Sequence, residues 1–183
     1  INAALSQSMS GVMFAMRSLI DPTIPMNDGC YRPLKATFPP GTLVNPRPPA
    51  ALNSRMATVG AMFDAILEAM SGAYPEKAVA ASCNVHLYTP AGVDKGTGRT
   101  WTFIDSLQGG GGARKSKDGI DVGGGPLIMG GSGGVNQSSE AYEMEHPVVI
   151  ERMQMWQDSA GAGKWRGGMG MLKQIRMLED GML

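Results

Sequence analysis

Apolar side chains recur at steps of three and four residues near the start of the chain. Such positions share one stripe of an α-helix, which here consists of Leu5, Met9, Val12, Met13, Met16 and Leu19. Pro22 follows, and proline disfavours helical geometry in the residue before it. The pattern predicts an amphipathic helix over residues 2–20.

A second stripe with the same spacing follows a proline-rich segment. It consists of Met56, Val59, Phe63, Ile66, Leu67 and Met70. Asn53 or Ser54 can cap its first turn, because a short polar side chain accepts hydrogen bonds from the free backbone N–H groups there. Gly72 and Pro75 mark its end. We therefore expect a second amphipathic helix.

Four segments carry the composition of β-strands. Residues 78–89 and 99–107 are rich in strand formers, and the turn-rich residues 90–98 between them favour antiparallel pairing. Residues 147–156 and 170–178 predict two further strands, separated by a glycine-rich turn.

Proline and glycine dominate two long loops. Residues 21–49 hold eight prolines and predict ordered loop with brief extended pieces at 35–38 and 42–44. Glycine is the commonest residue over 109–134 and loses the most entropy on ordering, so this stretch is either flexible or held closely against a neighbour. The fold class that follows is mixed α/β (α+β): two amphipathic helices, mixed strands and long Gly/Pro-rich loops.

Charge and composition narrow the classes of function. Sixteen basic and sixteen acidic side chains balance, without a cluster of Lys or Arg, so a nucleic-acid partner is not expected. No apolar run reaches the roughly 18 residues that cross a bilayer, so no membrane association is expected. Cys30 and Cys83 suggest neither a disulfide framework nor a zinc site and favour the cytoplasm. The 15 methionines suit an adaptable core or a subunit contact.

The first candidate site lies in the proline-rich loop between residues 21 and 29. Asp21, Asn27 and Asp28 offer oxygen atoms on a backbone stiffened by two prolines, so they can bind a cation or take a proton. The alternative is that the same side chains only build turns.

The second candidate is the glycine run with its basic neighbours. Gly110, Gly111 and Gly112 can cradle an anion with their backbone N–H groups, and Asp118 follows shortly after. The spacing does not match the nucleotide-binding P-loop, since Arg114 stands where that motif needs glycine. A flexible surface loop is the alternative, and a free-standing module for small anions is a further hypothesis that rests on this run.

The third candidate is the turn at residues 158–168. Asp158 and Arg166 are the candidate catalytic residues, because an arginine can pair with a carboxylate or phosphate. The alternative is a compact turn in which Asp158 accepts backbone N–H bonds and Arg166 ties the turn to a neighbouring element. His86 and His146 lack the spacing of metal ligands, so no metal site is expected in this segment.

These segments occur in the order typical of one enzyme family. The chain resembles the C-terminal part of the hydantoinase B/oxoprolinase family in a set of ordered motifs: Asp21-Pro22, Ile24-Pro25, Asn27, Gly29, Arg32-Pro33, Pro40-Gly41, Asn45-Pro46, Pro49-Ala50, Gly110-Gly111-Gly112-Ala113, Asp118-Gly119, Asn136, Glu140, Glu143, Asp158-Ser159, Gly161-Ala162-Gly163 and Arg166-Gly167-Gly168. The resemblance spans nearly all of residues 1–183.

The resemblance implies a catalytic B-type subunit in a hetero-oligomer. Residues 1–183 are then a single segment from its C-terminal part, working with an A-type partner that binds ATP and Mg²⁺ and cleaves ATP. A divalent metal is expected in the preceding part of the subunit. The implied reaction is ATP-dependent opening of hydantoin, 5-oxoproline or other lactam rings through phosphoryl activation. A ketone carboxylase of the acetone or acetophenone type and a non-catalytic scaffold for subunit assembly are the alternatives.

The resemblance also implies which loops lie near substrate or partner. Beside Asp158 and Arg166, the candidate substrate or interface positions are Asp21, Asn27, Gly110, Gly111, Gly112, Asp118, Asn136, Glu140, Ser159, Gly161, Gly163 and Gly167.

Overall fold

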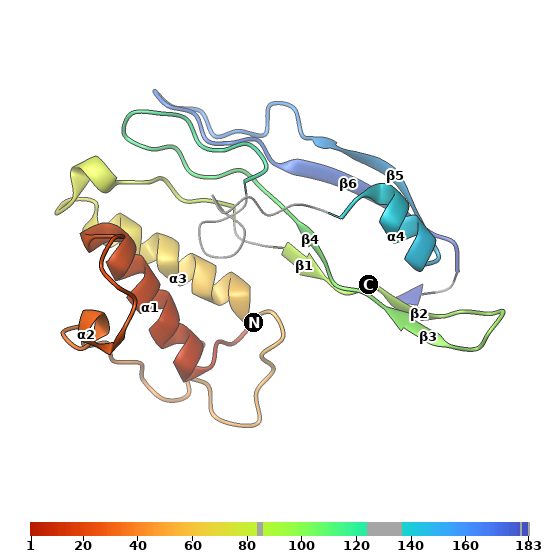
Figure 1. Ribbon diagram of the computed structural model, residues 1–183, viewed down its shortest axis with the longest axis horizontal. Coiled ribbons are helices and arrows are strands. Elements are labelled where there is room, and N and C mark those ends of the chain that lie inside the picture. Colours follow the sequence, from red (N-terminus) through yellow and green to blue (C-terminus); the bar gives the residue numbers. More distant parts are fainter. Residues whose placement is uncertain (84–85, 124–136, 180, 183) are drawn as a thin grey trace.

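The computed structural model describes residues 1–83, 86–123, 137–179 and 181–182. Its helices are α1 (Leu5–Ile20), α2 (Asp28–Tyr31), α3 (Arg55–Met70) and α4 (Ser139–Glu145), with a 3-10 turn at Pro75–Lys77. Its strands are β1 (His86–Tyr88), β2 (Ala91–Val93), β3 (Thr100–Thr102), β4 (Asp105–Leu107), β5 (Val148–Met155), β6 (Met171–Met177) and β7 (Gly181–Met182). The helices α1 and α3 lie at one end, and the strands with α4 form the rest (Figure 1). The mixed α+β fold class is confirmed.

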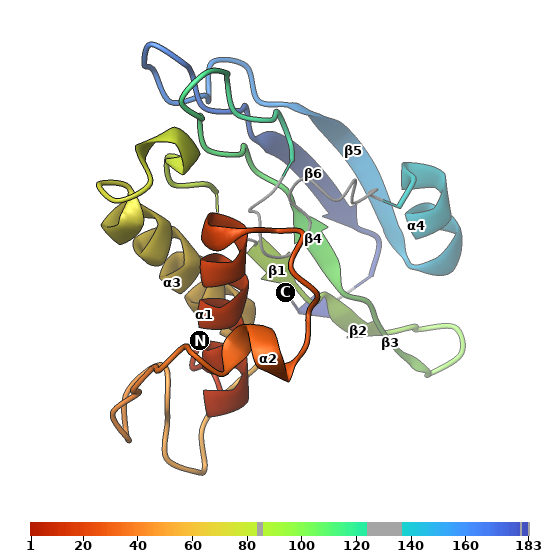
Figure 2. The ribbon, with the colours of Figure 1, turned by 60° about the vertical axis from the view of Figure 1, so that its left-hand side comes forward.

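The two predicted amphipathic helices, α1 and α3, pack against each other. Their shared core consists of Ala15, Leu19, Phe63 and Leu67. Figure 2 shows α1 in front of α3, with α2 on the outer side of α1. Among the described helices, none is both long and apolar enough to span a lipid bilayer.

The buried face of α1 differs from the predicted stripe. Apart from Leu19 it is made of small residues, namely Ser8, Gly11 and Ala15, while Leu5 at the start of the stripe is exposed. A methyl group added to Gly11 would come within 2.7 Å of Cε of Met62 on α3. The two helices therefore approach too closely for a row of large methionines to lie between them.

The proline-rich segment forms loops rather than the brief strands expected at 35–38 and 42–44. Only an isolated bridge joins Thr42 to Asn45. Proline has no backbone N–H to donate to a strand ladder, and Pro39, Pro40 and Pro46 flank both pieces. The segment is held to α1 and the residues before it instead: the Ser8 hydroxyl donates to the carbonyl of Val44 at 2.7 Å, and the Ala3 N–H donates to the carbonyl of Leu43 at 2.9 Å.

The predicted antiparallel pairing of residues 78–89 with 99–107 is confirmed, although the strands are shorter. Strand β1 pairs with β4, and β2 pairs with β3 and with β7. Residues 91–93, expected in the turn, belong to β2. The turn itself is closed by the Asp94 N–H, which donates to the carbonyl of Arg99 at 2.9 Å.

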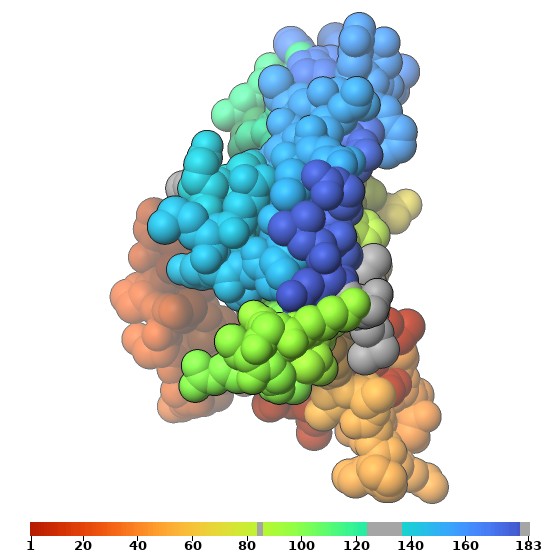
Figure 3. Space-filling view, turned by 90° about the vertical axis from the view of Figure 1, so that its right-hand side faces the viewer, coloured from red at the N-terminus to blue at the C-terminus, as the bar shows by residue number. Residues whose placement is uncertain are grey.

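The last two predicted strands, β5 and β6, form a long antiparallel ribbon with an irregularity between Ile150 and Arg152. The seven-residue helix α4, which the sequence did not predict, lies on this ribbon. Phe103, Tyr142 and Val148 form the second core between these elements. Figure 3 shows α4 beside the β5–β6 ribbon, with the β2–β3 hairpin below them.

Candidate functional site

The glycine run at residues 109–113 lies between two other backbone segments, and we call this arrangement the glycine layer. On one side the Cys83 N–H donates to the carbonyl of Gly110 at 3.0 Å. On the other side the Gly168 N–H donates to the carbonyl of Gly111, and the Gly111 N–H donates to the carbonyl of Ile120, both at 2.9 Å. This part of the glycine-rich stretch is therefore held in place, and the flexible-loop alternative is wrong for it.

The layer is packed so closely that two of its positions, Gly110 and Gly112, admit no side chain. A methyl group added to Gly110 would overlap the backbone of Gly168, and one added to Gly112 would overlap the carbonyl of Ala80. At Gly161, by contrast, nothing lies within 4 Å of the same added atom. The glycines at 110 and 112 are thus required by backbone contact, since any Cβ there would force the segments apart.

A cavity of about 400 Å³ opens along this layer, within the range of about 300–1,000 Å³ that is common for small-molecule sites. Glycine and alanine make up most of its lining residues, together with Trp165, Cys83, Ser82 and Ser159. Burial raises the pKa of the Cys83 thiol, so the thiol is neutral at pH 7. Among the lining residues, all within the described ranges, none carries a charged side chain.

Ser82 in this wall is held from behind by Asp64 on α3. The Ser82 N–H donates to Oδ2 of Asp64 at 3.2 Å, and the Ser82 hydroxyl donates to the same carboxylate at 3.3 Å. Burial raises the pKa of the Asp64 carboxyl, while the two hydrogen bonds from Ser82 oppose that effect. The pair places one oriented hydroxyl at the edge of the glycine layer.

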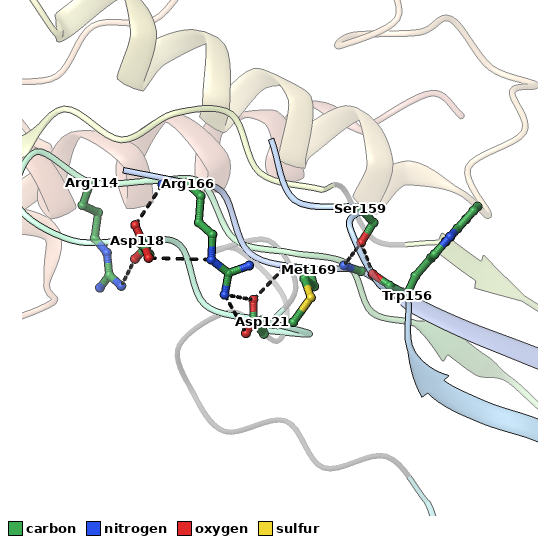
Figure 4. A network of polar contacts seen from close by, with 8 residues as sticks. Arg114, Asp118, Asp121, Trp156, Ser159, Arg166 and Met169 are labelled. Atoms are coloured by element: carbon green, nitrogen blue, oxygen red, sulfur yellow. Dashed lines mark hydrogen bonds and ion pairs between the residues drawn. The ribbon is translucent and has the colours of Figure 1, made fainter. Parts of the chain in front are cut away.

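Arg166 forms a compact polar network with two aspartates (Figure 4). Its guanidinium lies 3.7 Å from Oδ2 of Asp118 and 3.3 Å from Oδ2 of Asp121. The two carboxylates also accept from the backbone, Asp118 from the Arg166 N–H at 2.9 Å and Asp121 from the Met169 N–H at 2.7 Å. Arg166 thus ties its turn to the neighbouring loop. This is the structural role that the alternative interpretation of residues 158–168 gave to Arg166. Asp121 was missed, although it follows Asp118 by three residues in the same loop.

Asp158 does not accept the backbone hydrogen bonds expected of it. Its φ of 57° places it in the left-handed region, and its exposed carboxylate has no hydrogen bond or ion pair within the described part of the chain. Ser159 takes that role instead: its hydroxyl accepts from the Gly170 N–H at 2.8 Å and donates to the carbonyl of Trp156 at 2.7 Å.

The structure divides the candidate residues among several places. Those that line the cavity are Gly110, Gly111, Gly112, Ser159, Gly161 and Gly167. Asp118 and Arg166 meet in the network beside it. Gly163 lies in the turn of Arg166, close to the backbone of Trp165. Asn136 lies outside the described residues.

The remaining candidates lie elsewhere. Asp21 accepts hydrogen bonds from the N–H and hydroxyl of Thr23, and Asn27 caps α2, so both build turns as the simpler interpretation expected. Glu140 is exposed in the first turn of α4.

A buried polar cluster at the strand end of the molecule was missed entirely. Its members are Tyr88, Asp105, Tyr142 and Lys173. The side chains of Asp105 and Lys173 are each 2% exposed, and their charged atoms lie 2.5 Å apart. Burial alone would raise the pKa of Asp105, but hydrogen bonds from Lys173 and both tyrosines together lower it.

This cluster fastens β1, β4, α4 and β6 to one another. Strand β4 leads directly into the glycine run, and β6 begins directly after the turn that holds Arg166. The Met171 N–H donates to the carbonyl of Gln108 at 3.1 Å, where the two strands meet the layer. The cluster therefore anchors the frame on which the cavity is built.

In the described ranges no three His, Cys, Asp or Glu side chains come together as a metal site. His146 stacks on Phe103, with ring centroids 4.3 Å apart, in keeping with a structural histidine.

The sequence model of one family, described as hydantoinase B/oxoprolinase, matches residues 1–183. The chain belongs to the hydantoinase B/oxoprolinase family. An uncharacterized relative from Methanocaldococcus jannaschii is 34% identical over 184 residues, which are 100% of this chain and 31% of that protein. The caprolactamase subunit beta of Pseudomonas jessenii is 30% identical, again over 100% of this chain and over 32% of that protein. The chain thus spans about a third of the length of these curated relatives.

Two solved structures share this fold. The ATP-dependent caprolactamase from Pseudomonas jessenii superposes with a TM-score of 0.78 at 29% identity, over 96% of this chain and 31% of that one. An acetone carboxylase superposes with a TM-score of 0.79 at 23% identity, over 94% of this chain and 23% of that one. Since the caprolactamase relative is named as a beta subunit, the family includes enzymes of more than one subunit.

Proposed function

We propose that this chain is part of the catalytic B-type subunit of a cytoplasmic, ATP-dependent hydrolase that opens cyclic amides. Its segment belongs to the C-terminal part of that subunit, and an A-type subunit that cleaves ATP is its partner. The observation that carries the proposal is the match of all of residues 1–183 to 32% of a caprolactamase subunit at 30% identity, joined by the likeness to the caprolactamase fold. Hydantoin, 5-oxoproline and caprolactam define the class of substrate.

The chemistry explains why ATP is needed. A lactam carbonyl is a poor electrophile, and transfer of a phosphoryl group to its oxygen makes attack by water favourable. The family resemblance implies that the partner subunit binds ATP and Mg²⁺. It also implies a divalent metal elsewhere in the B-type subunit. The residues of this chain supply an uncharged wall for the ring, built from the glycine layer and fixed by the Arg166 network and the buried Asp105 cluster.

A ketone carboxylase is the second candidate, favoured by the likeness to acetone carboxylase. The acetone carboxylase is only 23% identical to this chain, and that likeness supports a shared fold alone. We therefore rank the carboxylase below the hydrolase. A scaffold that only joins subunits is the third candidate. It differs from the first two in placing the cavity away from any substrate.

The test is to express the whole gene containing this segment together with its neighbouring A-type gene. Phosphate release from ATP is then measured with caprolactam, hydantoin and 5-oxoproline, and separately with acetone and bicarbonate. We expect a cyclic amide to stimulate phosphate release and to appear as the open-chain product. Stimulation only by acetone with bicarbonate would support the carboxylase, and no stimulation by any of them would contradict both.

A further inference from the structure

We infer that the glycine-lined cavity binds an uncharged cyclic amide, and that the Ser82 hydroxyl, held by Asp64, accepts the hydrogen bond of its ring N–H. The inference rests on the proposed function and narrows its substrate class. It assigns a binding role to Ser82 and a positioning role to Asp64.

The hydrogen-bonding capacity of Ser82 gives the first argument. A serine hydroxyl has one proton and two lone pairs. The proton points to the Asp64 carboxylate, and the Ser82 N–H is bound to the same group, so rotation of the hydroxyl is restrained. Only acceptor capacity remains toward the cavity that Ser82 lines. The group therefore recognises a donor such as an amide N–H.

The second argument is that Ser82 differs from the other polar side chains of the wall. The hydroxyl of Ser159 already donates to Trp156 and accepts from Gly170, so its proton and one lone pair are used within the turn. The Cys83 thiol is neutral, and a thiol is a weak hydrogen-bonding partner. Ser82 is the side chain of the wall best placed to orient a ring.

The absence of charge from the lining residues gives the third argument. A carboxylate that enters a cavity without a cationic partner loses its hydration, which is costly. The Asp64 carboxylate directly behind Ser82 adds repulsion of a second negative charge. A neutral lactam meets neither penalty. The cavity therefore favours rings such as caprolactam over 5-oxoproline, which carries a carboxylate.

The flat wall suits a planar amide group. Gly110, Gly111 and Gly112 all line the cavity and carry no side chain, so one face of a ring can lie against their backbone. Trp165 is the aromatic residue among those that line the same cavity. The shape of the cavity then selects the size of the ring, and Ser82 selects the direction of the ring N–H. This is expected for a pocket with few polar groups.

The experiment uses the full B-type subunit in complex with its A-type partner. Ser82→Ala and Asp64→Asn are compared with the wild type and with Ser6→Ala, a control on the exposed face of α1. KM and kcat are measured for caprolactam and 5-oxoproline, and the inhibition constant for N-methylcaprolactam, which lacks the N–H. Binding of caprolactam to each variant is measured separately by calorimetry without ATP.

We expect Ser82→Ala to raise KM and the dissociation constant for caprolactam about tenfold, equivalent to ~1.4 kcal/mol. It should leave kcat and the inhibition constant of the N-methyl compound within about twofold, because no N–H bond is lost there. Asp64→Asn should lower KM for 5-oxoproline relative to caprolactam, since the repulsion is removed. Ser6→Ala should match the wild type.

Several outcomes would overturn the inference. Unchanged binding of caprolactam in Ser82→Ala would remove Ser82 from the site, and an equal loss for caprolactam and its N-methyl analogue would show general damage to the cavity. A wild-type preference for 5-oxoproline over caprolactam would contradict the neutral-ring assignment. If these occur while lactams still stimulate ATP cleavage, the inference fails and the proposed function stands; if no lactam stimulates cleavage, the proposed function fails as well.

Discussion

The buried pair of Asp105 and Lys173 allows a quantitative test of what holds the strand end of the molecule together. Both side chains are 2% exposed, and Tyr88 and Tyr142 donate to the same carboxylate. Asp105→Asn keeps the shape but leaves the ammonium of Lys173 buried without a counter-charge. Removing one partner of a buried ion pair costs about 3–5 kcal/mol, which is a large part of the ~5–15 kcal/mol that stabilises a typical domain.

The assay is urea unfolding of the purified protein, followed by tryptophan fluorescence. A matched control is Glu151→Gln, which breaks an ion pair of 2.7 Å with the more exposed Arg176. Exposed pairs contribute roughly 0.2–1 kcal/mol, so the control should move the midpoint little.

The double variant Asp105→Asn with Lys173→Met removes both charges and should recover part of the loss. If Asp105→Asn cost no more than Glu151→Gln, the claim that the cluster anchors the frame of the cavity would be refuted.

The remaining predictions concern the glycine layer, pH and the turn of Arg166. Gly110→Ala should lower the free energy of unfolding by about 2 kcal/mol or more, because its methyl group overlaps backbone; Gly161→Ala, which meets nothing within 4 Å, should be neutral or slightly stabilising in the same urea assay. Since the pKa of Asp105 is lowered from 3.8 on folding, its contribution is full above that value and is lost as pH falls below it. The wild-type urea midpoint should therefore fall more steeply below about pH 4 than that of Asp105→Asn, and parallel curves would speak against this. Arg166→Ala and Asp158→Ala are each expected to lower turnover or break subunit assembly, as judged by phosphate release and gel filtration. Unchanged turnover and complex size in both variants would remove these residues from the site.

Much of the fold follows from local periodicity and turn chemistry. The helices α1 and α3 were predicted because their apolar stripes repeat over sixteen residues each. The strands β5 and β6 were predicted from their composition, although their pairing was not, and the pairing of β1 with β4 was predicted from strand formers on either side of a turn. Helix α4 was missed because seven residues are too few to show a period. Its Ser138 cap, which accepts from the Ala141 N–H at 3.3 Å, was the available signal.

The site was only partly predictable, because its contacts join residues far apart in sequence. The contact of Asp118 with Arg166 joins two segments that the sequence had singled out, but nothing in either one shows that they meet. Asp105 follows the apolar residues Phe103 and Ile104 in a predicted strand, which suggests a buried charge in need of a partner. No spacing rule connects it with Lys173, which lies 68 residues away. The buried face of α1, which consists mainly of small residues, could not be predicted either, because it depends on how closely α3 approaches α1.

A structure of the full complex with a bound neutral lactam tests the central claim most directly. We predict that the ring lies in the glycine-lined cavity with its nitrogen within about 3.2 Å of the Ser82 hydroxyl oxygen. A ring bound more than about 10 Å from this cavity, beyond hydrogen-bond reach of its wall, would contradict the account.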